Sequence, residues 1–364
     1  MGRRSKKPSA TKKRVRSDKK AGVRKKTQPT SSNAKEPSAN DYLEQAEKSM
    51  ENFQIELAEK FCRRALQVDP RNVEALEMTA TVLQELGQSE EARQLLQRAI
   101  ELEPDTGHAK YLALGQTLAG REAFECLRKG VTIMERDFER AAASSSSSGS
   151  LSGLEVSNGF CALAELFLTD LCDEPNAEKS CEEYCARALQ FEPNNSDALQ
   201  LKASFMLSAG KSPDEARECM KKSVGLWLGR RDDDDDDEAS GRDENLVPSY
   251  SSRRSAVKIL LELEEFELAS RVIESLLDDD DEVIEVWYLG GWMYHLMGDE
   301  HRAESVAHLK RAKELGEKLG CDDVDMMQHV DELLGEIEEE SEEEEEEEED
   351  VNDDDNDEDE MDTQ

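Results

Sequence analysis

Two stretches with the same residue plan, Ala58–Pro70 (AEKFCRRALQVDP) and Ala92–Pro104 (ARQLLQRAIELEP), indicate the fold of this chain. The apolar residues of each stretch recur at helical spacing, and the small residues would let neighbouring helices approach closely. Each closing proline would end its helix before the next unit begins. Four positions match at a constant shift of 34 residues: Ala58 with Ala92, Ala65 with Ala99, Leu66 with Ile100, and Pro70 with Pro104.

A helix–turn–helix unit of this length is the period of the tetratricopeptide repeat (TPR). Later units follow the plan with more distortion, at Tyr111–Leu118, Cys181–Pro193 and Trp287–Tyr294, and the turn of the first of these is expected to be compressed. No β-rich segment competes, so the sequence predicts an all-α, TPR-like solenoid, a superhelix of about seven helical hairpins. Residues 322–337 would form a capping helix with one apolar face: Val324, Met327, Val330, Leu334 and Ile337.

Charge divides the chain into parts. The 364 residues carry 46 Lys and Arg against 86 Asp and Glu, a net charge of −40, and only 37% are hydrophobic. That much like charge opposes compaction of the whole chain into one domain. The expected parts are a disordered basic arm (1–38), TPR-like repeats (39–229) with a Ser-rich insertion (144–153), an acidic flexible loop (230–248), further repeats with the capping helix (249–337), and a disordered acidic tail (338–364).

The basic arm holds 13 Lys and Arg among residues 1–26, with Asp18 as its one acid. This density is typical of a nuclear import signal, so an import receptor is an expected partner. Two other interpretations stay open, namely contact with RNA phosphates and folding of the arm onto the acidic tail. No aromatic residue is present in the arm for base stacking, so nucleic acid is expected to bind weakly at most. The residues assigned to the import signal are Lys12, Lys13, Arg14, Arg16, Lys19, Lys20, Arg24, Lys25 and Lys26.

Catalysis, cofactors and metals have little support in the sequence. Neither a Gly-rich phosphate loop with Lys and Ser/Thr, nor H-E-x-x-H, nor G-x-S-x-G occurs, so no enzyme activity and no cofactor are expected. Cys181 and Cys185 lie one helical turn apart, and thiolates so placed can share a metal. Both take packing positions of their repeat, however, and no C-x2-C pair occurs in the chain. A role as small buried apolar residues is therefore favoured over a metal site.

The expected location is the cytoplasm and the nucleus. No stretch approaches the roughly 20 apolar residues that cross a membrane, and no apolar region follows the charged N-terminus as in a secretory signal. The eight cysteines would then stay reduced. Neither a membrane partner nor an oligomer is expected.

A groove along the repeats is the predicted binding site. In TPR stacks the first helix of each hairpin lines the concave face, whereas Trp287 takes a packing position. Counting the groove positions from Ile284 gives Glu285, Tyr288, Trp292, His295 and Leu296, of which the first three are assigned to the binding site. A helical face of acids is commonly only a solvated surface, but two acidic tracts elsewhere in the chain favour a cationic partner. The same count in the first two repeats predicts an acidic groove with Glu47, Glu51, Glu74, Glu77 and Glu85.

These features together resemble a known family, the TPR-type assembly chaperones dedicated to the fourth protein of the large ribosomal subunit. The resemblance rests on the repeat pair 41–104, Tyr111–Gln116 (YLALGQ), Val286–Trp292 (VWYLGGW) and the acidic C-terminus, and it spans most of residues 41–350. It implies a protein that binds a newly made, very basic ribosomal protein, prevents its aggregation, escorts it to the nucleus and releases it onto the large-subunit precursor. The client's extended internal loop would lie along the concave face. The basic arm departs from the family pattern.

Two other classes of function stay open. One is a histone chaperone, or a general nuclear chaperone of basic proteins, which also combines polyacid tracts with nuclear import. The other is a TPR scaffold adaptor that grips the acidic C-terminal peptide of a heat-shock chaperone. The adaptor needs Lys and Arg in the groove to hold a carboxylate. The positions counted in the first two repeats and the last repeat contain neither, so this alternative is disfavoured.

Overall fold

The computed structural model describes residues 37–144, 151–229 and 247–338, and all regular structure in these ranges is helical. The predicted all-α, TPR-like solenoid is confirmed. Each odd-numbered helix packs against the next helix, which makes seven hairpins in the described ranges. They are α1 (Ala39–Glu51) with α2 (Ile55–Val68), α3 (Val73–Glu85) with α4 (Ser89–Leu102), α5 (Ala109–Gly115) with α6 (Gly120–Ser144), α7 (Gly153–Leu168) with α8 (Ala177–Phe191), α9 (Ser196–Ser208) with α10 (Pro213–Gly225), α11 (Tyr250–Glu262) with α12 (Phe266–Asp279), and α13 (Ile284–Met297) with α14 (Arg302–Leu319).

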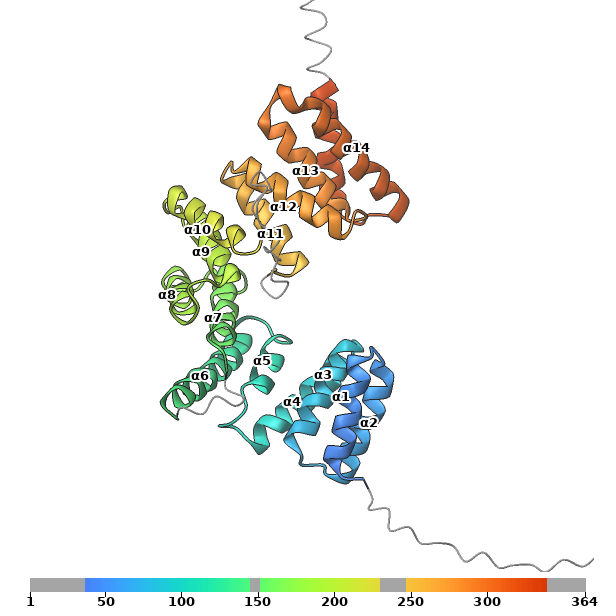
Figure 1. Cartoon of the computed structure of the whole chain (residues 1–364), viewed down its shortest axis with the longest axis vertical. Helices are drawn as coiled ribbons and strands as arrows, with labels where there is room; N and C mark the ends of the chain where they lie inside the picture. Colours follow the sequence, from blue (N-terminus) through green and yellow to red (C-terminus); the bar gives the residue numbers. More distant parts are fainter. Residues whose placement is uncertain (1–36, 145–150, 230–246, 339–364) are drawn as a thin grey trace, which may run out of the picture.

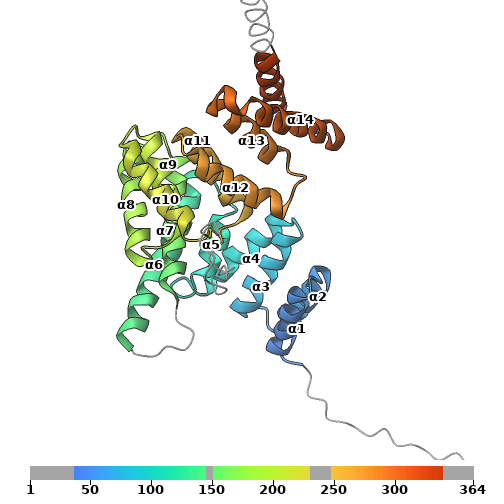
Figure 2. The same cartoon turned by 45° about the horizontal axis from the view of Figure 1, so that its top comes forward.

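The hairpins follow one another along an arc, with α1 and α2 at one end and α13 and α14 at the other (Figure 1). The view in Figure 2, turned by 45°, shows that the path also winds out of a single plane. A short 3-10 helix, η2 (Asp299–His301), precedes α14, and a last helix covers residues 324–338. Because each hairpin contacts mainly its neighbours, the fold is held together step by step along the chain.

Small residues allow the two helices of a hairpin to approach, as the sequence predicts. Ala58, Ala65, Ala92 and Ala99 are all fully buried. A Cβ atom on Gly115 would lie 2.6 Å from Cγ of Leu127, and one on Gly291 would lie 2.6 Å from Cγ of Leu309. Neither Cβ could be added without displacement of the facing leucine side chain, so glycine permits the close approach at both positions.

The third hairpin departs from the regular repeat. Its first helix, α5, has 7 residues, and its second helix, α6, has 25 residues. The compression expected at this turn is therefore seen as a shortened α5, after which α6 begins earlier than the repeat would place it. Helix α6 extends to Ser144 and α7 begins at Gly153, where Ser152 caps it by accepting from the Glu155 backbone. The two ends of the predicted Ser-rich insertion thus belong to helices, and residues 145–150 lie outside the described residues.

The capping helix at 324–338 is also present, and its buried face includes the predicted Val330 and Ile337. Val330, Leu333 and Ile337 are buried and cluster with Leu309 and Ala312 of α14. The prediction for Val324 is wrong, because this side chain is 71% exposed. It stands at the first position of the helix, before the helix meets α14. Leu333 is buried in place of the predicted Leu334, which is only half-buried.

In the ranges that the structure describes, no helix is both long enough and apolar enough to cross a membrane. The residues of the predicted import signal, the run of acids at 232–238 and residues 339–364 lie outside the described residues.

Candidate protein-binding groove

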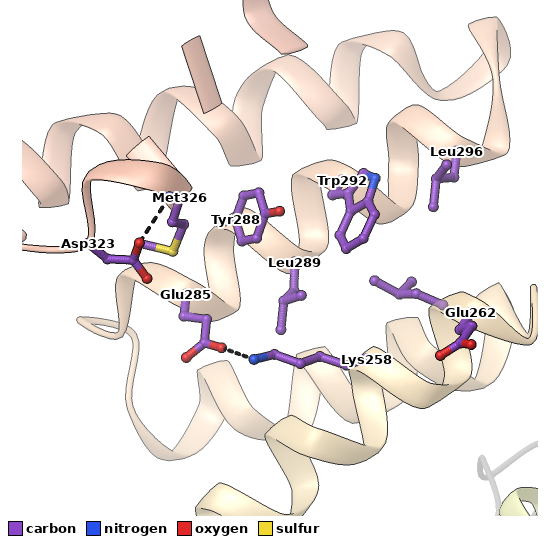
Figure 3. A pocket seen from close by; sticks show the side chains of 10 residues that line it. Lys258, Glu262, Glu285, Tyr288, Leu289, Trp292, Leu296, Asp323 and Met326 are labelled. Carbon is purple, nitrogen blue, oxygen red and sulfur yellow. Dashed lines mark hydrogen bonds and ion pairs between the residues drawn. The ribbon is translucent and has the colours of Figure 1, made fainter. Parts of the chain in front are cut away.

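Two cavities open between the first helices of consecutive hairpins. One, here called the aromatic pocket, has a volume of about 650 Å³ and lies between α11, α13 and residues 323–326 (Figure 3). The other has a volume of about 600 Å³ and lies between α7, α9 and the first part of α11. No second helix of a hairpin lines either cavity. Both cavities thus lie on first helices, and a continuous binding groove along these helices stays a prediction.

Two stacked rings, Tyr288 and Trp292, line the aromatic pocket, and a third ring, His329, supports them. Tyr288 and Trp292 are stacked, with ring centroids 6.0 Å apart and an interplanar angle of 19°. His329 of the last helix meets both rings nearly at right angles, at 5.7 Å from Tyr288 and 5.8 Å from Trp292. The Tyr288 hydroxyl also forms a hydrogen bond of 2.9 Å with Nδ1 of His329. The contacts hold Trp292 in one orientation, pointing into the cavity from α13 (Figure 3).

The charges of the aromatic pocket are three carboxylates and one ammonium group. Glu285 is fully used within the chain, because its two oxygens lie 2.6 Å from Nζ of Lys258 and 2.9 Å from a guanidinium nitrogen of Arg254. Asp323 accepts the backbone N–H of Met326 at 3.0 Å and so caps the last helix. Glu262 lies across the cavity on α11, exposed, and makes no ion pair with any other described residue. Burial raises the pKa of the Tyr288 hydroxyl, which therefore stays protonated.

The acids predicted in the first two repeats lie on the first helices, as counted. Glu47 and Glu51 lie on α1, and Glu74 and Glu85 lie on α3; all four are exposed. They line neither of the two cavities. The structure thus brings Glu285, Tyr288 and Trp292 together at one pocket, and it leaves the N-terminal acids as a separate surface. Their role as groove residues stays a prediction.

Glu77 differs from the other N-terminal acids because it has a partner inside the fold. Lys110 of α5 is only 1% exposed, and its Nζ lies 3.5 Å from Oε1 of Glu77. The same ammonium group donates to the backbone carbonyl of Thr106. A buried lysine needs such a counter-charge. Glu77 therefore has a structural role in joining α3 to α5.

Several residues of the aromatic pocket were not predicted from the sequence. Two of them, Lys258 and Glu262, lie one 34-residue period before Trp292 and Leu296, and Arg254, which pairs with Glu285 beside the pocket, lies one period before Tyr288. The same count of groove positions, started at Tyr250, would have found them. His329 and Asp323 had no such signal, because they belong to the capping helix and its start, outside the repeat. The groove does contain Arg and Lys on α11, and the single carboxylate of Glu285 forms an ion pair with each of them.

Cys181 and Cys185 are buried in the core, as the packing interpretation predicts. A hydrogen bond between the two thiols and their burial raise the pKa of Cys185. Within the described ranges, no group of three or more His, Cys, Asp or Glu side chains is arranged to hold a metal ion.

Trp287 is half-buried, and its ring N–H donates to the carbonyl of Asp281 at 2.8 Å. This tryptophan packs against α14, with its ring 5.2 Å from that of His308, and does not line the aromatic pocket.

Comparison with known proteins identifies a repeat family, two relatives in sequence and a similar solved structure. Residues 49–115 match the tetratricopeptide repeat family. The chain is 31% identical over 297 residues to a probable assembly chaperone of rpl4 from Schizosaccharomyces pombe, covering 76% of this chain and 83% of the relative. It is 28% identical over 271 residues to a probable assembly chaperone of rpl4 from Emericella nidulans, covering 71% of this chain and 64% of that relative. A solved structure of the assembly chaperone of RpL4 (Acl4) aligns with a TM-score of 0.64 and 27% identity, over 74% of this chain and all of that one.

Proposed function

Since the chain belongs to the family of assembly chaperones of rpl4, we propose that it binds a newly made, strongly basic ribosomal protein of the rpl4 kind in its concave groove. The observation that carries the proposal is the aromatic pocket, where an ordered aromatic wall lies beside three carboxylates and one ammonium group. Apolar and aromatic surface with a few fixed charges is typical of sites that bind protein segments. The excess of carboxylates favours a basic segment.

The proposed consequence of binding is protection. Covering the basic segment would prevent aggregation of the client and keep it away from RNA until it is handed to the large-subunit precursor. The acidic tracts at 232–238 and 338–364 would assist by neutralising the client surface. An exposed ion pair contributes only about 0–1 kcal/mol, and charges act over about 8 Å at physiological salt, so the tracts cannot provide the specificity.

Escort to the nucleus is part of the proposal. The basic arm would bind an import receptor, and the complex would pass from the cytoplasm to the nucleus with the chaperone as a monomer. No step of this function requires catalysis by the chain, and the relatives are chaperones with the same repeat fold.

Affinity purification from cells with identification of the bound proteins tests the client. Recovery of rpl4 in near-equal amount is the expected result. Recovery of histones without enrichment of a ribosomal protein would instead favour the general chaperone of basic proteins, and recovery of heat-shock chaperones would favour the adaptor.

The groove is tested with exposed acids that have no known structural role. The triple change Glu47→Gln, Glu74→Gln and Glu85→Gln is expected to weaken client binding about tenfold, since three exposed ion pairs of about 0.5 kcal/mol each are lost. A matched control removes the same charge from second helices, with Glu56→Gln, Glu101→Gln and Glu122→Gln. Equal weakening by both triple variants, measured by titration calorimetry, would contradict a groove on the first helices.

A further inference from the structure

We infer that the aromatic pocket selects arginine over lysine, so that one arginine of the bound segment inserts between α11 and α13. The inference rests on the proposed function only for the identity of the client. Its structural basis is three side chains around one cavity: Trp292 supplies a ring face, Glu262 supplies a carboxylate, and Leu296 supplies an apolar rim. Each of the three matches one part of an arginine side chain.

The ring face is prepared for a planar cation. Trp292 is held by stacking on Tyr288 and by the edge contact with His329, so its indole does not have to be ordered when a ligand binds. A guanidinium group lies flat on an indole and keeps its in-plane N–H donors free to reach a carboxylate. A lysine ammonium is a compact and strongly hydrated charge, and loses more on leaving water for this surface.

The carboxylate that meets this cation is Glu262. Glu285 already holds Lys258 and Arg254 with its two oxygens, and Asp323 is engaged as a helix cap. Glu262 stands on α11 opposite Trp292 and has no ion-pair partner among the described residues (Figure 3). It is thus the acid of the pocket whose oxygens are taken neither by an ion pair nor by a helix cap among the described residues.

The apolar rim accounts for the remaining part of the ligand. Leu296 is 46% exposed at the end of α13, beside the pocket. Arginine carries three methylene groups before its guanidinium, and these pack on apolar surface while the charged end reaches its partner. The volume of about 650 Å³ exceeds one side chain, so part of the backbone of the same segment also fits.

The chain uses the same combination inside its own fold. The guanidinium carbon of Arg187 lies 4.9 Å from the ring centroid of Phe160, and the same guanidinium forms an ion pair with Glu135. An aromatic ring and a carboxylate on neighbouring elements therefore suffice to hold an arginine in this type of hairpin stack.

A direct test uses small probes and the full-length chain. The protein is labelled with 5-fluorotryptophan, and its fluorine NMR signals are followed during titration with three probes: the Nα-acetyl amides of arginine, lysine and citrulline. The signal of Trp292 is identified as the one lost in Trp292→Phe. The arginine probe is expected to shift the Trp292 signal with a dissociation constant about tenfold lower than the lysine probe, and the neutral citrulline probe should bind more weakly than either. Equal binding of arginine and citrulline, or a shift confined to Trp227 or Trp287, would overturn the inference.

A pair of charge variants tests the acid. Glu262→Gln is expected to lower the affinity for the arginine probe about fivefold or more. Glu267→Gln, which changes another exposed acid on α12 away from the pocket, should have no effect. Unaltered arginine binding by Glu262→Gln would overturn the assignment. Thermal unfolding of both variants verifies that neither change disturbs the fold.

Binding of full-length rpl4 separates this inference from the proposed function. If rpl4 is captured but the probes are not discriminated, the selective pocket is wrong and the proposed function stands. If the probes are discriminated but rpl4 is not captured, the pocket stands and the proposed client is wrong.

Discussion

Phe53 is an unusual residue in the turn of the first hairpin. It has φ of 57°, in the left-handed region, and its side chain is 91% exposed. The equivalent position one period later is Gly87, with φ of 72°. A left-handed conformation costs a non-glycine residue about 1–2 kcal/mol. The first hairpin therefore stores strain that the second hairpin avoids.

Replacement of this residue is expected to stabilise the protein. Phe53→Gly should raise the free energy of unfolding by about 1 kcal/mol, because removal of the Cβ strain exceeds the added chain entropy of glycine. Phe53→Ala keeps a Cβ atom and should give little or no gain. Urea unfolding of the three proteins measures the difference, and a glycine variant no more stable than the alanine variant would contradict the explanation.

The ion pair of Lys110 and Glu77 is a second feature at the residue scale. The stability lost on breaking it should depend on which partner is removed. Loss of the acid leaves a buried ammonium group without a counter-charge, whereas loss of the lysine leaves an acid that is still partly exposed. Glu77→Leu is therefore expected to cost about 2–3 kcal/mol of stability, and Lys110→Met clearly less. The same measurement of unfolding checks both. Equal costs would show that the two charges are equivalent in the fold.

Among the elements, the capping helix at 324–338 has two roles. Its buried side chains cover the apolar surface of α14, and its His329 supports the ring wall of the aromatic pocket. A solenoid needs such a cover where the repeats end. Here the cover also takes part in the candidate site, so the end of the stack and the pocket depend on one helix.

The register of this helix can be tested with two adjacent leucines. Leu333→Ala is expected to cost about 2–4 kcal/mol, because Leu333 is 3% exposed, and Leu334→Ala about half as much or less. Leu333→Ala should also broaden or shift the Trp292 fluorine signal through His329. A larger cost for Leu334→Ala would mean that the helix presents the face suggested by the sequence pattern alone.

At the scale of the whole molecule, the net charge of −40 acts at long range and the groove acts at contact distance. Long-range attraction increases the rate of encounter with a basic partner and is screened by salt. Under the proposed function, contacts in the groove would determine which partner stays bound, mainly through the rate of dissociation. The two contributions are therefore separable in kinetics.

Removal of residues 339–364 is expected to slow association with rpl4 and to make the association rate less dependent on salt, with little change in dissociation. The triple groove variant of the first helices should instead mainly increase the dissociation rate. Stopped-flow measurements at low and physiological salt distinguish the two effects. This division of roles would be contradicted if deletion of the tail abolished binding of rpl4 while the triple groove variant bound it unchanged.

The sequence by itself determined the repeat, the number of hairpins and the positions of Tyr288 and Trp292 on a first helix. These follow from short-range periodicity, since the same small and apolar residues return in every unit and pack against an adjacent unit. Only the tertiary structure decided which acidic side chains remain available to bind a partner. Glu77 and Glu285 look like groove acids along the chain, yet each meets a basic side chain of a neighbouring hairpin.

The ring contacts of the aromatic pocket also depend on tertiary packing. Tyr288 meets His329, 41 residues away, only because the capping helix folds back over the last hairpin. A helical pattern states which residues share a face, but the partner of that face depends on how the helices stack. Packing of non-repeating elements is set by the sum of many weak contacts across the interface, and no short stretch of sequence records it.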